Sequence, residues 1–493
     1  MKNLIKILPL LLLMATVQSC SDILNNAQPS TATTPNKALH SASGIKALRA
    51  GMYNEFDTFN YTTRYMLGPS SLADGLYVRS GANRFSGLNT NANQAGMDNW
   101  NNSYHLINRA NLLINHIPDG VISKGLKAQY RGEAYFVRAF AYHQLARTYG
   151  YEPGMTPSSG GGSGFKLGVP LETQPTLSSS QAVYHPRVNE TKIYQQIVSD
   201  LKNSISLLSQ QQSGNVFYPS KAAAEAELAR VYLYWRKYSD SNKYAMQAIQ
   251  DANAMGVKET TASQVPTMFD ETKGKDPEGI WIYHITPSTM SLGVNNSLNV
   301  YTANQYVAQV PTQSIMNLYG KNDARLSWFS PCYSENGNKP EPGCLATSPY
   351  IDNGKKALEL DKYNAEPGQY ADDIPYLRVS ELLLIESEDR LKGASGSALD
   401  PINKLRTHRG LAPLKKVTMQ NILNSRRREF IGEGMRFFDL KRLGMDIKKA
   451  PQTGASDVPY FDHRVLDNIP NGEVANSKAH APKDSVIVQN PGY

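Results

Sequence analysis

Hydrophobic and small side chains recur with helical spacing over several long stretches of the chain. Between residues 132 and 150 they fall every three or four positions, at Ala134, Val137, Ala141, Leu145 and Tyr149. This spacing places them on one face of an α-helix, and Gly150 marks its end. The pattern predicts a mainly helical protein.

Residues 226–252 predict two helices joined by a short turn at 238–240. One side of the first helix carries Leu228, Tyr232 and Trp235, and the second presents Ala245, Ala248 and Ile249. Small residues that face large ones across a turn are typical of a tetratricopeptide hairpin. We expect similar pairs at 44–58 with 98–116, 128–149 with 190–209, and 376–392 with 400–409. The chain therefore predicts a tetratricopeptide-like helical-repeat scaffold of about four helix pairs.

Two long insertions interrupt the helical pattern, at about 68–97 and about 255–372. Connections of this length are usually functional or disordered. Within the second insertion, IWIYHI at 280–285 favours a β-strand, although the sequence does not decide whether it pairs. Trp281 in this run is interpreted as a core residue.

The N-terminus resembles a bacterial lipoprotein signal. Lys2 and Lys6 precede an apolar run at 8–17, which is too short to span a bilayer, and Cys20 follows small and polar residues. We expect residues 1–19 to be a signal peptide, Cys20 to be acylated and to hold the protein on the outer membrane, and residues 20–40 to be a flexible tether. An ordinary signal peptide with an incidental cysteine is the alternative.

Charge and cysteine content narrow the possible functions. The formal charge of +8 falls to +6 when Lys2 and Lys6 leave with the signal peptide. Because this excess of positive charge is small and the chain is exported, the sequence does not predict nucleic-acid binding. Cys332 and Cys344, in a Pro- and Gly-rich loop, are a candidate disulfide in an oxidising compartment. Neither cysteine has a second ligand at zinc spacing, so no metal site is predicted.

The stretch RRREFIGEGMRFFDLKRLG, residues 426–444, combines cations, acids and phenylalanines. On a helix, Ile431, Met435 and Phe438 would share one face. Acid and base side chains three positions apart would pair as Glu433 with Arg436, Arg436 with Asp439, and Asp439 with Arg442. Gly432 and Gly434 allow a kink or a close backbone approach. The stretch is interpreted as a docking element of the scaffold, because a phosphate site would leave its cations unpaired.

The same stretch resembles the C-terminal signature of SusD-like (RagB/SusD) outer-membrane nutrient-binding lipoproteins. The matching positions are Arg426, Arg427, Arg428, Glu429, Glu433, Gly434, Arg436, Phe437, Phe438, Asp439, Leu440 and Arg442. Other similar pieces follow in family order: 132–150, GVPL at 168–171, 376–390, 402–411 and the terminal NPGY. The resemblance covers nearly the whole mature chain, implies a SusD-like domain at 41–493, and places these motifs in the scaffold.

The resemblance implies both a fold and a role. It implies helix pairs that support a loop-rich ligand-binding subdomain, in an extracellular lipoprotein that covers a SusC-like TonB-dependent transporter and captures oligosaccharides for it. Members often carry several acids after the acylated cysteine, whereas this chain has only Asp22 nearby. This difference weakens the expectation that the protein faces the extracellular side.

A glycan site needs aromatic rings to stack on sugar faces and polar side chains to bind hydroxyl groups. Both insertions offer such residues, beside the further possibilities Arg79, Asn83 and Tyr306. The candidates are Asp74, Tyr77, Arg84, Phe85, Tyr283, Tyr301, Trp328 and Tyr333.

No catalytic motif competes with this interpretation. The histidines lack H-E-x-x-H spacing, and there is no G-x-S-x-G or phosphate-binding glycine loop, so we expect no cofactor and no catalysis. Two alternatives stay open: a peptide-binding member of the same family, and a helical-repeat scaffold without a small ligand.

Overall fold

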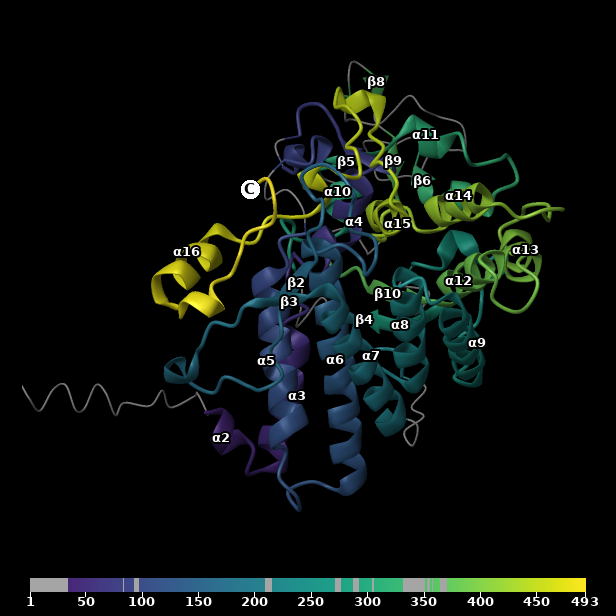
Figure 1. The fold of residues 1–493 in the computed structure, drawn as a ribbon. Helices are drawn as coiled ribbons and strands as arrows, with labels where there is room; N and C mark the ends of the chain where they lie inside the picture. Colours follow the sequence, from purple (N-terminus) through teal and green to yellow (C-terminus); the bar gives the residue numbers. More distant parts are fainter. Residues whose placement is uncertain are drawn as a thin grey trace, which may run out of the picture.

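The computed structural model describes residues 34–82, 84–92, 97–208, 215–270, 276–286, 292–303, 306–330, 351–352, 355–356, 358–363 and 370–493. Long helices stand side by side in its lower part, and short helices and strands gather at the upper end (Figure 1). The mainly α fold is confirmed. Among the described residues no helix has both the length and the apolar character needed to cross a membrane.

The helices are α2 (Pro35–Ala38), α3 (Ala42–Asn54), α4 (Thr63–Ser71), α5 (Trp100–His116), α6 (Lys124–Tyr149), α7 (Glu190–Leu208), α8 (Lys221–Tyr234), α9 (Tyr238–Ala254), α10 (Asn299–Thr302), α11 (Gln313–Met316), α12 (Val379–Leu391), α13 (Leu399–Thr407), α14 (Met419–Glu429), α15 (Arg436–Arg442) and α16 (Asn471–His480). The strands are β1 (Leu76–Val78), β2 (Leu167–Pro170), β3 (Arg187–Asn189), β4 (Gly279–Tyr283), β5 (Gln309–Pro311), β6 (Phe329–Ser330), β7 (Ile351–Asp352), β8 (Lys355–Lys356), β9 (Glu359–Leu360) and β10 (Ile374–Arg378). They form two-stranded antiparallel pairs: β1 with β5, β4 with β10, β2 with β3, β6 with β9, and β7 with β8.

The expected helix pairs are present. Contacts join α3 to α5, α6 to α7, α8 to α9, and α12 to α13. The core of the scaffold runs through α8, whose side chains from Ala222 to Tyr234 are all buried. Its alanines allow α7, α9 and α12 to pack closely around it.

The turn between α8 and α9 was predicted too late in the sequence. α9 already begins at Tyr238, because the chain reverses earlier, at Arg236 and Lys237. Arg236 adopts a left-handed φ of 57°, and the Lys237 N–H donates to the Tyr232 carbonyl at 2.9 Å, which closes the end of α8.

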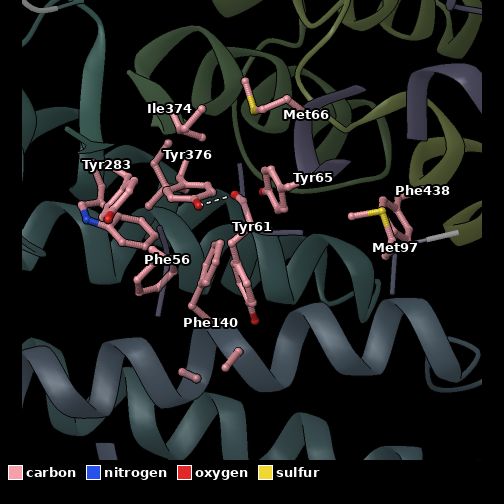
Figure 2. Packing of buried hydrophobic residues seen from close by; sticks show 14 of the residues in the cluster. Phe56, Tyr61, Tyr65, Met66, Met97, Phe140, Tyr283, Ile374, Tyr376 and Phe438 are labelled. Atoms are coloured by element: carbon pink, nitrogen blue, oxygen red, sulfur yellow. Dashed lines mark hydrogen bonds between the residues drawn. The ribbon is translucent and has the colours of Figure 1, made fainter. Parts of the chain in front are cut away.

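An aromatic cluster joins the scaffold to the strand pair formed by β4 and β10 (Figure 2). The ring of Trp281 in β4 lies 5.0 Å from Phe140 of α6 and 4.7 Å from Tyr376 of β10, measured between centroids. The Tyr376 hydroxyl donates to the Tyr61 carbonyl at 2.5 Å. The IWIYHI run therefore forms a buried strand, and the interpretation of Trp281 as a core residue is confirmed.

The C-terminal stretch is two helices with a glycine turn between them, so the expected single apolar face is wrong. Gly432 and Gly434 have φ of 71° and 73°, and a Cβ on Gly434 would lie 2.3 Å from the Tyr65 carbonyl oxygen. Only glycine fits this close approach. As a result Met435 packs into a different cluster from Ile431 and Phe438.

A buried network of ion pairs surrounds Glu429 at the end of α14. Arg409 lies 2.8 Å, Arg325 2.9 Å and Arg378 3.3 Å from its carboxylate oxygens. Burial alone would raise the pKa of Glu429, but the three guanidinium charges outweigh it and hold that pKa well below its ordinary range. The network joins α14 to β10, to the loop after α13 and to the second insertion.

Most of the local ion pairs expected in the C-terminal stretch are wrong. Asp439 does bind Arg442 at 2.9 Å. Glu433, however, binds Arg378 at 2.6 Å, and Arg436 binds Asp74 at 2.6 Å. Glu433 and Arg436 bind distant partners because the glycine turn separates Glu433 from α15. The turn also buries the two side chains against other segments of the chain.

Replacing Glu429 with glutamine should destabilise the protein by about 3–5 kcal/mol, because three buried guanidinium groups would lose their shared counter-charge. The measurement is the free energy of unfolding in urea, followed by circular dichroism. As a control, Asp457→Asn removes the exposed pair with Lys448 and should cost at most about 1 kcal/mol. A similar loss in both variants would contradict the role of the network.

Asp276→Asn should stabilise the protein at pH 8 more than at pH 5. Burial raises the pKa of Asp276 to about 7, so the folded state keeps its proton where the unfolded state has lost it. Stability therefore falls as pH rises from the unfolded pKa of about 4 toward 7, and asparagine removes this loss. Its amide oxygen can still accept the Glu278 N–H, now bound at 2.9 Å. The test compares the urea midpoint of unfolding of the variant and of wild type at both pH values, with the exposed Asp484→Asn as control. A change in midpoint that is equal at pH 5 and pH 8 would refute the prediction.

Candidate functional site

The β1–β5 strand pair brings the two insertions together. Tyr77 pairs with Val310 and Val78 with Gln309, and the Arg79 N–H continues the ladder to the Ala308 carbonyl at 3.0 Å. Segments of the first and second insertions that lie more than 200 positions apart in the sequence are thereby joined side by side in one strand pair.

A cavity of about 300 Å³ opens beside this strand pair. We call it the tyrosine cleft, and its lining residues are Arg79, Gly81, Ala82, Arg84, Tyr301, Tyr306 and Ala308. Tyr306 is 38% exposed, so its ring is open to solvent at the wall of the cleft, whereas Tyr301 is buried beneath it. The two rings lie 5.8 Å apart.

Asn295 holds the polar groups of the cleft in place. Its carbonyl accepts hydrogen bonds from Arg84 at 2.9 Å and from the Tyr301 hydroxyl at 2.6 Å. Its side-chain oxygen accepts from Arg84 at 3.3 Å and from the Tyr306 hydroxyl at 3.1 Å. Burial raises the pKa of Tyr301, which keeps the hydroxyl proton available as a donor. Nothing in the sequence singles out Asn295, because it stands beside Asn296 in a loop, where asparagines are ordinary turn residues.

Aromatic packing and a carboxylate support the cleft from below. Phe85 stacks on Phe59 with centroids 5.4 Å apart and meets Tyr301 edge-on at 5.0 Å. The Arg84 guanidinium carbon lies 5.9 Å from the Tyr306 ring centroid, within cation–π range. Asp372 accepts the Asn299 N–H at 3.0 Å, which fixes the start of the helix that carries Tyr301. These contacts hold the rings in place before any ligand arrives.

Of the predicted site residues, the structure places Arg84 and Tyr301 in the tyrosine cleft and Phe85 directly behind it. Tyr306 and Arg79, noted as further possibilities, also line it. Tyr333 and the cysteines Cys20, Cys332 and Cys344 lie outside the described residues.

Asp74 forms a structural ion pair. It is only 8% exposed and binds Arg436 at 2.6 Å and Arg427 at 3.1 Å. Burial alone would raise the pKa of Asp74, but the hydrogen bond and charge of Arg436 outweigh it and lower that pKa. The carboxylate thus anchors the first insertion to the C-terminal stretch.

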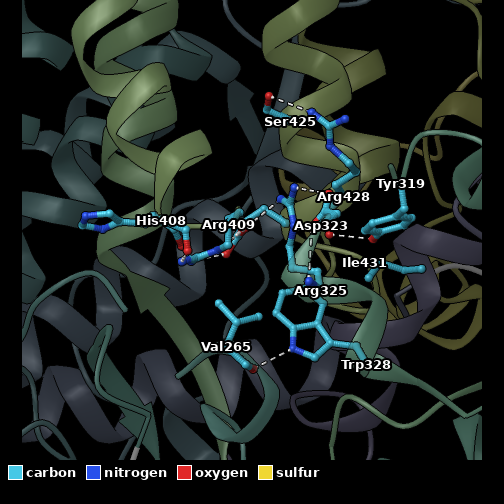
Figure 3. Close-up of polar contacts among 12 residues, drawn as sticks. Val265, Tyr319, Asp323, Arg325, Trp328, His408, Arg409, Ser425, Arg428 and Ile431 are labelled. Carbon is cyan, nitrogen blue, oxygen red and sulfur yellow. Dashed lines mark hydrogen bonds and ion pairs between the residues drawn. The ribbon is translucent and has the colours of Figure 1, made fainter. Parts of the chain in front are cut away.

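Trp328, Tyr77 and Tyr283 are buried. The Trp328 indole N–H donates to the Val265 carbonyl at 3.1 Å (Figure 3), and its ring lies 4.4 Å from the Lys362 ammonium group. Tyr283 belongs to the aromatic cluster around Phe56, with ring centroids 5.7 Å apart. We leave these three residues out of the candidate site, because they are buried and none of them lines the cleft.

The cleft offers one open aromatic wall, fixed polar groups and a small volume. Such a surface can stack a ring or sugar face and exchange hydrogen bonds with hydroxyl groups. Within the described residues, no group of three or more histidine, cysteine, aspartate or glutamate side chains is placed to hold a metal ion.

Comparisons with known proteins agree with the helical-repeat fold. A SusD-like family model described as "Starch-binding associating with outer membrane" matches residues 24–233, and a second, described as "SusD family", matches residues 267–493. SusD-like protein P2 from Formosa agariphila is 23% identical over 530 residues, which cover 98% of each chain.

Solved structures share the fold. A putative sugar-binding protein from Bacteroides vulgatus superposes with a TM-score of 0.74 at 23% identity, covering 92% of this chain and 99% of that one. Surface glycan-binding protein A from Bacteroides thetaiotaomicron, in complex with laminarihexaose, superposes with a TM-score of 0.68 at 18% identity, covering 91% and 99%. Because the two family models together span most of the sequence, the chain belongs to the SusD-like family.

Proposed function

We propose that the protein is a noncatalytic cell-surface lipoprotein that captures oligosaccharides in the tyrosine cleft. The observation that carries this proposal is the cleft itself, where the open ring of Tyr306 stands beside hydrogen-bonding groups fixed by Asn295. A solved protein of the same fold has laminarihexaose bound.

The remaining parts of the proposal concern location and partner. The family is associated with the outer membrane. We propose that acylated Cys20 provides the anchor, that the domain faces the outside of the cell, and that the captured glycan passes to a SusC-like TonB-dependent transporter. The signal-like N-terminus and the family membership support these steps.

Tyr306→Ala should weaken glycan retention about tenfold, because the exposed ring supplies the stacking surface of the cleft. Affinity electrophoresis through gels that contain laminarin or another polysaccharide measures the effect. Phe461→Ala is the matched control: Phe461 is 48% exposed and lies outside the cleft, so its loss should leave retention unchanged.

The same experiment tests the proposal as a whole. Retention without release of sugar supports a noncatalytic binder, and Arg84→Ala should weaken it as well. Release of shorter sugars would identify a hydrolase, and binding to a peptide panel with no glycan retained would favour the peptide alternative. Equal retention by wild type and Tyr306→Ala would refute the choice of site.

Trp328→Ala should destabilise the fold by about 3–5 kcal/mol, because it empties a fully buried site. At a temperature where the variant is still folded, its glycan retention should match wild type, since the ring does not line the cleft. Thermal unfolding and affinity electrophoresis on the same preparation separate the two effects. Weak glycan retention by a fully folded Trp328→Ala variant would contradict this prediction and show that Trp328 contributes to glycan binding.

A further inference from the structure

A row of asparagines on α5 binds the backbone of an extended segment of the chain. Asn108 exchanges two hydrogen bonds with Thr176, at 2.7 and 3.1 Å. Asn111 donates to the carbonyls of Glu172 and Gln174 at 3.2 and 3.1 Å, and Asn115 donates to that of Thr173 at 2.9 Å. A carboxamide can do this because it carries both a donor and an acceptor, as a peptide group does.

The asparagine row continues beyond this segment to Asn101. Asn101 lies seven positions before Asn108, which puts both on the same face of the helix. Its side chain is exposed and makes no hydrogen bond to any part of the chain that the structure describes. Unlike the three asparagines after it, Asn101 has no backbone to bind.

Asn101 borders a cavity of about 290 Å³ between α5 and the loop at 171–186. Tyr184 of this loop and Glu473 of α16 also line it. His185 closes the loop by an interaction with Glu172 at 2.6 Å. Val183 on this loop also lines the cavity and is 68% exposed, so it offers an apolar contact to an occupant.

A second cavity of about 290 Å³ adjoins the first. The two share His105, Asn108 and Thr176, so together they form one groove across α5, which we call the α5 groove. The second cavity is mostly apolar and is lined by Leu48, Leu112, Pro175 and Leu177 among others, and its one arginine, Arg109, is paired with Glu55 at 2.7 Å. The groove therefore has a polar end at Asn101 and an apolar end at Leu48.

The charge at the polar end of the groove favours a cationic group of the occupant. In the described ranges, Glu473 forms no ion pair with a lysine or arginine. A bound cation near this carboxylate would add an attraction that steers and selects the partner.

We propose that the α5 groove binds an extended peptide strand of a partner protein. The strand offers its backbone to Asn101, places an apolar side chain among the leucines, and carries a lysine or arginine toward Glu473. An extended strand fits because its backbone groups are free, whereas a helix has already satisfied its own. An oligosaccharide fits less well, because the leucines and prolines of the apolar end match an aliphatic side chain better than a row of hydroxyl groups. The proposal does not depend on the glycan function of the tyrosine cleft.

The test uses the purified full chain and a positional-scanning library of synthetic hexapeptides. We expect selection for an aliphatic residue at one position and lysine or arginine at another. Asn101→Ala should weaken the best peptide about fivefold, through loss of its hydrogen bonds to the peptide backbone. Glu473→Gln should remove the preference for a cation while keeping the aliphatic one. Asn253→Ala, an exposed asparagine on α9, is the control and should change neither.

Three outcomes would overturn the proposal. They are a library without any consensus, the same consensus and affinity in Asn101→Ala and Glu473→Gln, and displacement of the peptide by laminarihexaose. The last would make the groove a sugar site. Tyr306→Ala should leave peptide binding intact, so a failure here is distinguishable from a failure of the tyrosine cleft.

Discussion

The structure depends on one buried charge, the carboxylate of Glu429. Three arginines converge on it from segments that are remote in sequence: Arg325 from the second insertion, Arg378 from β10 and Arg409 from the loop after α13. An ion this deeply buried is stable only while its partners stay in place. The network therefore fixes the helical scaffold and the second insertion relative to each other.

The C-terminal stretch also uses buried ion pairs to fix both insertions to the scaffold. Arg427 and Arg436 bind Asp74 in the first insertion, and Glu433 binds Lys362 in the second. Lys449 adds a further anchor, since its ammonium group donates to the carbonyls of Leu72 and Leu88 at 2.9 and 3.0 Å. The segment that most resembles a charged binding surface is thus the inner anchor of the loops that form the tyrosine cleft.

Scaffold and recognition surfaces are consequently built from different chemistry. The charges around Glu429 are paired and buried, so they have little capacity left for a ligand. The cleft instead exposes a ring whose hydroxyl is held by Asn295, and its rigidity lowers the entropy that a bound ligand must remove. The α5 groove, on the outside of the scaffold, likewise presents uncharged polar groups, because Asn101 continues a row of side-chain amides that bind backbone groups.

The sequence by itself determined the helices, their pairing and the family, because apolar periodicity and the C-terminal signature are local patterns. It also selected Arg84 and Tyr301, as members of a wider set of aromatic and polar side chains in the two insertions. It did not separate them from Trp328, Tyr283 or Asp74, which have the same chemistry but are buried away from the cleft. Only the tertiary structure decided this, because exposure depends on which distant segments cover a residue, as Lys362 covers Trp328 and Arg436 covers Asp74. The ion-pair partners were decided in the same way: the turn at Gly432 and Gly434 redirected Glu433 and Arg436 from their sequence neighbours to remote partners.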